Sequence, residues 1–398
     1  MSRWESQPLG SVCEVVSGST PKSGVPDFWG GDILWVTPKE LSGLDGISIG
    51  ATERSLTSAG LASCGARVLP AGSVLLSSRA PIGHTAITVA PMATNQGFKS
   101  LVPDAGRLHA RYLLRWLRGH RSQIEDLGSG ATFKEVSKRV VERIEIPLPP
   151  LDEQRRIAAV LDRADALRTK RRTTLAGLDE LMRSIFAELV GDEASSPWET
   201  ARIGDLCATS SGGTPDRSVT ENYGGEIPWV KSGELHDPLV LSTQETLTRQ
   251  GLESSSAKVL PAGTVLVAMY GATAGVVAQL GISASTNQAI CALNPGPALK
   301  ATWLVHALRN SMRSLLATRA GGAQPNLSQD KVRNHVIPVP PLAVQEEFES
   351  AVRRIETTRD ASQRHYIALE SLFASLQQRA FRGDLFDSPL PAELTNVG

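Results

Sequence analysis

Cysteine is scarce in this 398-residue sequence, which contains four: Cys13, Cys64, Cys207 and Cys291. They are scattered, form no Cys-x-x-Cys pair, and have no histidine nearby at the spacing of metal ligands. Neither a disulfide framework nor a zinc site is therefore indicated. We expect all four to be reduced residues that pack in the interior.

Long apolar runs are also missing. No stretch of eighteen apolar residues occurs, and the N-terminal Met-Ser-Arg-Trp-Glu has no signal-peptide core. With 41% hydrophobic and 21% charged residues, the composition is that of an ordinary globular protein. We expect a cytoplasmic protein of two or three domains that makes no membrane contact.

The sequence lacks the motifs that carry catalysis. It has no phosphate-binding Gly-x-x-x-x-Gly-Lys-Ser/Thr, no Gly-x-Gly-x-x-Gly, no His-Glu-x-x-His and no Gly-x-Ser-x-Gly. The Asn/Asp-Pro-Pro-Tyr motif of adenine methyltransferases is absent too. The seven histidines are dispersed, and a lone one such as His84 is more often a structural or surface group than a base. Nothing positive indicates an enzyme, a metal or a cofactor.

An excess of positive charge is missing as well, because 41 Lys and Arg balance 41 Asp and Glu. A neutral chain is unusual for a protein that holds DNA alone, since phosphate contacts supply most non-specific affinity. Either local basic patches are enough to bind DNA, or partner proteins supply much of the contact with it. One patch repeats at helical spacing from Arg107 to Arg118, and the favoured interpretation is that it is the solvated face of a core helix rather than a DNA contact. A second, Arg168-Thr-Lys-Arg-Arg172, is harder to explain as a solvated face.

The strongest positive signal is an internal duplication. Pro147-Leu-Pro-Pro-Leu-Asp-Glu-Gln154 recurs 191 residues later as Pro338-Val-Pro-Pro-Leu-Ala-Val-Gln345. Other pairs recur at a separation of 191 to 194 residues, among them Trp35 and Trp229, Thr20-Pro21 and Thr214-Pro215, Glu40 and Glu234, and Asn95-Gln96 and Asn287-Gln288. A period of this length indicates a duplicated domain rather than a solenoid, and such a duplication reproduces a pseudo-two-fold dimer in one chain.

Each copy of the Pro-rich motif predicts the start of a long helix. Proline suits the first helical turn, and acidic residues such as Asp152 suit the positive end of the helix dipole. A seven-residue apolar repeat follows each start, interrupted by Arg168 and Arg171 in the first copy and by Arg359 in the second. Two helices of roughly 39 residues, about 58 Å long, are expected to pack on each other.

Short β-branched runs alternate with Gly, Pro and Ser turns before each long helix, and one helix is expected over 108–124 and its equivalent over 299–316. The predicted fold class is α+β, with two duplicated α+β domains and two long antiparallel helices. The expected boundaries are a first domain over 1–150, a central helix over 151–191, a second domain over 192–341, a C-terminal helix over 342–385 and a tail over 386–398.

The repeated segments resemble a known family. Trp35-Val-Thr-Pro-Lys-Glu-Leu41, Val68-Leu-Pro-Ala-Gly-Ser-Val74, Ala80-Pro-Ile-Gly83, Asn95-Gln96 and Ile146-Pro-Leu-Pro-Pro-Leu-Asp-Glu-Gln154 together are similar to the specificity subunit of type I restriction-modification systems. The resemblance implies two target-recognition domains, each reading one part of a bipartite, asymmetric DNA site. It also implies that the helices near 152–190 and 343–383 separate the domains and dock methyltransferase subunits, two of them expected, and restriction subunits through these. Catalysis would belong to those partners. The second copy departs from the family pattern at Ala343-Val344, where the first has an acidic pair.

Base contacts need polar side chains on loops that reach a groove. The candidates are Lys22, Ser77, Ser78, Arg79, His84, Thr132 and Lys134 in the first copy, and Tyr270, Gln324 and Asn326 in the second. Several lie where the copies differ, as reading two half-sites would require, although neutral loop drift would also produce the difference. The candidates for the spacer and for partner binding are Gln154, Arg168, Arg171, Gln345 and Arg359. The competing function is a coiled-coil scaffold that organises proteins without binding DNA.

Overall fold

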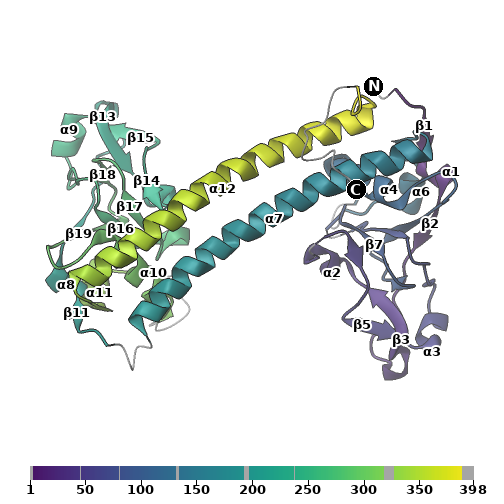
Figure 1. Cartoon of the computed structure of the whole chain (residues 1–398), viewed down its shortest axis with the longest axis horizontal. Coiled ribbons are helices and arrows are strands. Elements are labelled where there is room, and N and C mark those ends of the chain that lie inside the picture. Colours follow the sequence, from purple (N-terminus) through teal and green to yellow (C-terminus); the bar gives the residue numbers. More distant parts are fainter. Residues whose placement is uncertain are drawn as a thin grey trace. The chain divides into compact units, whose positions relative to one another are not determined.

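The computed structural model describes residues 3–44, 46–79, 81–130, 134–191, 197–236, 238–317 and 327–387 (Figure 1). The chain divides into two compact units. Unit 1 comprises residues 1–172 and 364–398, and unit 2 comprises residues 173–363. Each unit therefore contains one mixed domain and parts of both long helices.

Unit 1 is built on three small sheets. The five-stranded sheet has the order β2 (Cys13–Ser17), β9 (Lys99–Pro103), β6 (Val74–Leu76), β7 (Thr85–Thr88) and β4 (Ser48–Ile49). The three-stranded sheet has the order β5 (Arg54–Leu56), β3 (Trp29–Val36) and β8 (Ala93–Thr94). A third pairs β1 (Ser6–Pro8) with β10 (Glu145–Pro147). The β4–β7 and β3–β8 pairs are parallel and the remaining pairs antiparallel.

Unit 2 repeats this topology strand for strand. Its five-stranded sheet has the order β12 (Cys207–Ser211), β19 (Ile290–Pro295), β16 (Val265–Ala268), β17 (Val277–Leu280) and β14 (Leu239–Val240). The smaller sheets are β15 (Glu245–Leu247), β13 (Tyr223–Val230) and β18 (Ser285–Thr286), and β11 (Thr200–Arg202) with β20 (Val336–Pro338). The predicted duplication and the α+β fold class are confirmed.

Short helices cover these sheets. In unit 1 they are α1 (Leu9–Val12), α2 (Pro38–Ser42), α3 (Ser58–Ala62), α4 (Ala110–Gly119), α5 (Arg121–Asp126), α6 (Lys138–Arg143) and the 3-10 helix η1 (Pro26–Phe28). In unit 2 they are α8 (Ile203–Leu206), α9 (Arg249–Glu253), α10 (Ala301–Ala317), α11 (Gln329–Asn334), η2 (Thr220–Asn222), η3 (Ser232–Glu234) and η4 (Gly271–Thr273). The helix expected over 108–124 is two helices, because the backbone leaves the helical conformation at His120.

The two long helices are α7 (Leu151–Val190) and α12 (Leu342–Arg382). In unit 1 the start of α7, including Ile157 and Leu161, shares a buried cluster with Leu376 and Ala380 near the end of α12. In unit 2 the end of α7 packs on the start of α12, where the rings of Phe186 and Phe348 are 5.4 Å apart between centroids. Both contacts are those of antiparallel helices, so the predicted helical pair is confirmed.

The four cysteines are free thiols, three of them buried and Cys64 half-buried, as expected of packing residues. Burial raises the pKa of Cys13 and of Cys291 to about 12, so neither is a nucleophile at neutral pH. Within the described residues no cluster of three or more His, Cys, Asp or Glu is arranged to hold a metal ion. No helix in the same ranges has the length and apolarity needed to cross a membrane.

Candidate nucleic-acid interface

The motifs that occur twice in the sequence meet at one place in the mixed domain of each unit. In unit 1, the Trp35 indole donates to the carbonyl of Ser19 over 3.1 Å, and the Thr20 hydroxyl bonds the side chain of exposed Gln96. The backbone N–H of Asn95 donates to Val36 over 3.1 Å. These contacts hold the loop after β2 to the loop after β8.

Unit 2 repeats the arrangement bond for bond. The Trp229 indole donates to Gly213 over 3.1 Å, Thr214 bonds exposed Gln288, and the N–H of Asn287 donates to Val230 over 3.0 Å. The repeated motifs thus form a common frame in the two domains. Features on which the domains differ must lie outside this frame.

A guanidinium lies over an aromatic pair beside the frame in both units. In unit 1, Arg54 of β5 lies 3.4 Å from the ring centroid of Trp29 and 5.6 Å from that of Trp35. In unit 2, Arg217 lies 4.7 Å from Tyr223 and 5.0 Å from Trp229.

The two arginines occupy different positions in the repeat. Glu245 of β15 stands where unit 1 has Arg54, since the two residues pair with the equivalent tryptophans. Its carboxylate binds Arg217 and Lys231, each over 2.6 Å. Both units therefore have a cation over the aromatic rings, but it comes from different positions of the repeat. A comparison of the two copies position by position does not detect this shared feature.

Gln154 and Gln345 perform one structural task twice. Gln154 is completely buried; its side-chain oxygen accepts from the N–H of His109, and its nitrogen donates to the carbonyls of Arg107 and Pro149 over 2.9 and 2.8 Å. Gln345 makes the equivalent bonds to Lys300, Ala298 and Pro340. Each glutamine thus ties the start of a long helix to the start of α4 or α10. The candidate role in partner binding is not supported for these two side chains.

The predicted base-contacting residues divide by accessibility. Lys22, Lys134 and Tyr270 are exposed. Arg79 is half-buried and lies 3.8 Å from the carboxylate of Glu135. These four remain candidates for contacts outside the frame.

His84 is half-buried, and its Nε2 lies 3.2 Å from the guanidinium of Arg121. Burial, and next the charge of Arg121, lower the pKa of His84 below its ordinary value. The imidazole is therefore neutral at pH 7. It also hydrogen-bonds the backbone of Leu41, so one nitrogen donates to Leu41 and the other accepts from Arg121.

Ser77 and Ser78 are corrections to the candidate list. Both are fully buried. The Ser77 hydroxyl donates to Pro81 over 2.6 Å and accepts from the N–H of His84, and that of Ser78 lies 3.4 Å from Lys99 Nζ. These serines directly follow β6, the central strand of its sheet, and the bridge from Ser77 to Phe98 continues that strand through the interior. Thr132, Gln324 and Asn326 lie outside the described residues.

Two of the three arginines of α4 bind carboxylates of the long helix α7. Arg115 is buried and donates to Asp162 and Asp165, each over 2.7 Å, and Arg111 donates to Asp162 over 2.6 Å. The interpretation of this patch as a solvated face is wrong for Arg115. Its ion pairs hold the mixed domain of unit 1 to the helix.

The arginines on the helical seam have the partners that a buried charge requires. Arg168 forms two hydrogen bonds with Glu370, over 2.7 and 3.0 Å, and lies 4.1 Å from the ring of Phe373. Arg359 donates to Asp179 over 3.1 Å. Arg171 is half-buried. Arg168 and Arg359 therefore each pair with a carboxylate of the other long helix.

Comparisons with known proteins agree with this geometry. Residues 1–176 and 195–370 each match a family model described as "Type I restriction modification DNA specificity domain". The chain is 26% identical over 96% of its length to the type I restriction enzyme MjaIX specificity subunit of Methanocaldococcus jannaschii, 93% of which is covered.

Two solved structures share the fold. One is the S subunit of a type I restriction-modification system from M. genitalium, with a TM-score of 0.60, 15% identity and 96% of both chains covered. The other comes from work on complex assembly and conformational transition of a type I restriction-modification system, with a TM-score of 0.58, 21% identity and coverage of 96% of this chain and 98% of that one.

Proposed function

Because this chain belongs to the specificity subunits of type I restriction-modification systems, we propose that it reads a bipartite, asymmetric DNA site and assembles with methyltransferase and restriction subunits. Specificity subunits of this family are non-catalytic. In this proposal the chemistry belongs to the partners: adenine methylation with S-adenosylmethionine, and ATP-driven restriction.

The observation that carries the proposal is a common frame with different surroundings. The Thr-Gln pair, the tryptophan and the strand order are the same in both domains. The segment that contains Arg79 and His84 in unit 1 differs from the equivalent segment around Tyr270 in unit 2, which has neither an arginine nor a histidine at these places. Side chains that differ within one frame can read different base edges from the same docking geometry. We therefore assign one half-site to the domain over 1–150 and the other to the domain over 192–341.

The long helices serve in this proposal as a spacer and as the docking site for two methyltransferase subunits. Affinity for DNA is expected to come largely from the assembled complex, because the chain has no net charge and two of its α4 arginines, Arg111 and Arg115, are paired with carboxylates of α7. The isolated chain should bind DNA weakly and without sequence preference. Tight, sequence-specific binding by the isolated chain would contradict this part of the proposal.

Four residues inserted between Ala176 and Gly177 of α7 test the spacer role. The insertion lengthens the helix by roughly 6 Å at about 1.5 Å per residue. Since base pairs are about 3.4 Å apart, the non-specific gap between half-sites should grow by one or two base pairs with both half-sites unchanged. Sequencing of modified adenines in cells that carry the variant and its partner subunits measures the gap directly.

A matched control is Gly177→Ala, because an added Cβ at Gly177 meets no atom within 4 Å. This variant should keep the parental site and gap. Altered half-sites, or an active insertion variant with an unaltered gap, would show that the helix does not set the distance. A scaffold that never binds DNA, the alternative function, would leave no pattern of modified adenines that depends on this chain.

A further inference from the structure

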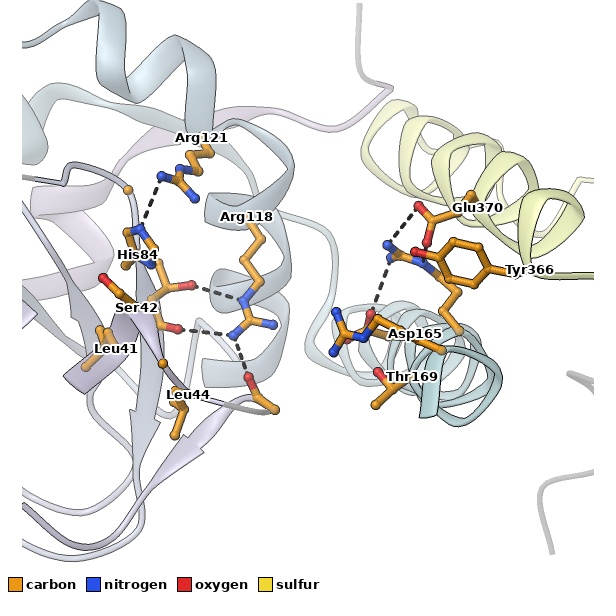
Figure 2. A pocket seen from close by; sticks show the side chains of 16 residues that line it. Leu41, Ser42, Leu44, His84, Arg118, Arg121, Asp165, Thr169, Tyr366 and Glu370 are labelled. Atoms are coloured by element: carbon orange, nitrogen blue, oxygen red, sulfur yellow. Dashed lines mark hydrogen bonds and ion pairs between the residues drawn. The ribbon is translucent and has the colours of Figure 1, made fainter. Parts of the chain in front are cut away.

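Each unit contains a cavity between its recognition domain and the long helices. The cavity of unit 1 has a volume of about 500 Å³ and that of unit 2 about 580 Å³. Figure 2 shows the unit 1 cavity, with Arg118 and Arg121 on the wall formed by the recognition domain and Asp165 and Glu370 on the wall formed by α7 and α12. The same parts of the repeat form the unit 2 cavity, with Arg309 in the place of Arg118.

The two cavities carry opposite charge. The lining of unit 1 has four arginines and two carboxylates: Arg118, Arg121, Arg168 and Arg172, with Asp165 and Glu370. The lining of unit 2 has two arginines and four carboxylates: Arg309 and Arg359, with Asp179, Glu234, Glu356 and Asp360. A chain without net charge thus has one basic cavity and one acidic cavity at equivalent places.

The linings differ by four charges, three of which arise at positions that are 191 residues apart in the repeat; the fourth is that of Glu234, whose counterpart Glu40 does not line the unit 1 cavity. Arg121 corresponds to Met312, Arg172 to Gln363, and Thr169 to Asp360. The first pair is also equivalent in space. A Cβ added at Gly83 would meet the Arg121 side chain, and one added at Gly275, which has the same backbone conformation, would meet Met312.

The acids of the basic cavity are already paired. Asp165 accepts from Arg115 over 2.7 Å, and Glu370 accepts two bonds from Arg168. Arg118 instead donates to the carbonyls of Gly46 and Thr85 and to the Thr85 hydroxyl.

Within the described part of the chain, no carboxylate lies at ion-pair distance from Arg118, although this arginine is half-buried. A half-buried guanidinium without an acid is stabilised by an external anion. The unit 1 cavity therefore contains a cationic group that none of the described carboxylates neutralises by direct pairing.

We propose that this cavity holds a backbone phosphate of the bound DNA, an inference that rests on the proposed function. Phosphate oxygens accept hydrogen bonds from guanidinium and hydroxyl groups, and the two walls offer both, the hydroxyls including those of Thr169 and Tyr366. His84 lines the same cavity, where its Nε2 lies 3.2 Å from the guanidinium of Arg121.

The composition of the lining favours DNA over an acidic segment of a partner protein. Leu41 and Leu44 are the aliphatic side chains among the described lining residues, and charged and polar groups make up most of the rest. Cores of protein interfaces are depleted of charge, whereas surfaces that contact nucleic acid are polar and positive. The acidic cavity of unit 2 repels phosphate, so the complex holds the DNA backbone through such a cavity in one half only.

The test replaces two cavity arginines by the residues that unit 2 has at the same positions, in the double variant Arg121→Met with Arg172→Gln. The control double variant, Arg155→Gln with Arg249→Gln, removes the same charge at exposed arginines outside the cavity. Each chain is assembled with its methyltransferase, and DNA affinity is measured by fluorescence anisotropy between about 50 and 200 mM salt, on a target duplex and on an unrelated one.

The slope of log affinity against log salt should become shallower in the cavity variant by about one unit for each phosphate that the cavity no longer binds, equally on both duplexes. The control should keep the parental slope. A parental slope in the cavity variant overturns the inference while leaving the proposed function intact. An equal change of slope in the control variant also overturns the inference. Weakened association with the methyltransferase at a parental slope overturns it too, because that result would show that a protein segment occupies the cavity. A parental complex that binds no DNA at all refutes the proposed function and this inference together.

Discussion

Replacing Gln154 by leucine should destabilise unit 1 locally and strongly. Leucine has nearly the same shape but leaves the N–H of His109 and the carbonyls of Arg107 and Pro149 without the partner that Gln154 gives them. A buried polar group left unsatisfied costs about 1–3 kcal/mol. For three such groups, some of which relax, the loss is roughly 3–6 kcal/mol, a large fraction of the roughly 5–15 kcal/mol typical of a domain.

Hydrogen exchange followed by mass spectrometry locates this loss. In the Gln154→Leu chain, protection of the amides at the start of α4 should fall by about two to four orders of magnitude, at about 1.4 kcal/mol per factor of ten. The equivalent amides at the start of α10 should keep parental protection. Gln345→Leu should give the mirror-image result, since Gln345 makes the same three bonds in unit 2.

Gln123→Leu is the matched control, because Gln123 lies exposed on α5. It should leave both sets of amides unchanged. A Gln154→Leu chain whose α4 amides change by less than about fivefold would refute the reasoning, because water or a backbone shift would then be replacing all three bonds. Equal loss of protection in both units would show that the effect is not confined to one site.

Two further predictions concern charge. Arg168→Leu should reduce the free energy of unfolding by only about 1 kcal/mol, because its ion pair with Glu370 is partly exposed, yet weaken assembly with methyltransferase subunits; co-purification and methylation equal to those of the parent would make Arg168 a surface residue without a role. Burial, and next the charge of Arg309, lower the pKa of His306 to about 4. Between pH 6.5 and 4 the unfolded chain therefore binds a proton at His306 that the folded chain does not bind. The free energy of unfolding of unit 2 should fall by about 3 kcal/mol over this pH range. Urea unfolding at about pH 7 and about pH 4.5 measures this loss, which His306→Phe should largely abolish.

The duplication, the fold class and the long helices could all be predicted from the order of the amino acids. These follow from local patterns: the Pro-rich helix starts at Pro147 and Pro338, the seven-residue apolar repeat, and the return of Trp35 as Trp229. Such patterns act over a few residues, so they are visible before the chain is folded. The same repeat placed Arg168 on the seam between the helices, where the structure pairs it with Glu370.

The partners of individual polar side chains could not be predicted before the fold was known. Gln154 bonds a helix start 45 residues away, Arg115 reaches carboxylates 47 and 50 residues away, and Arg168 pairs across 202 residues. Ser78 was indistinguishable in sequence from an exposed loop serine until the packing around β6 buried it. Burial and pairing depend on which distant segments meet, and no local pattern encodes that. The opposite charges of the two cavities exist for the same reason, because walls from separate segments bring their arginines and carboxylates together only in the folded chain.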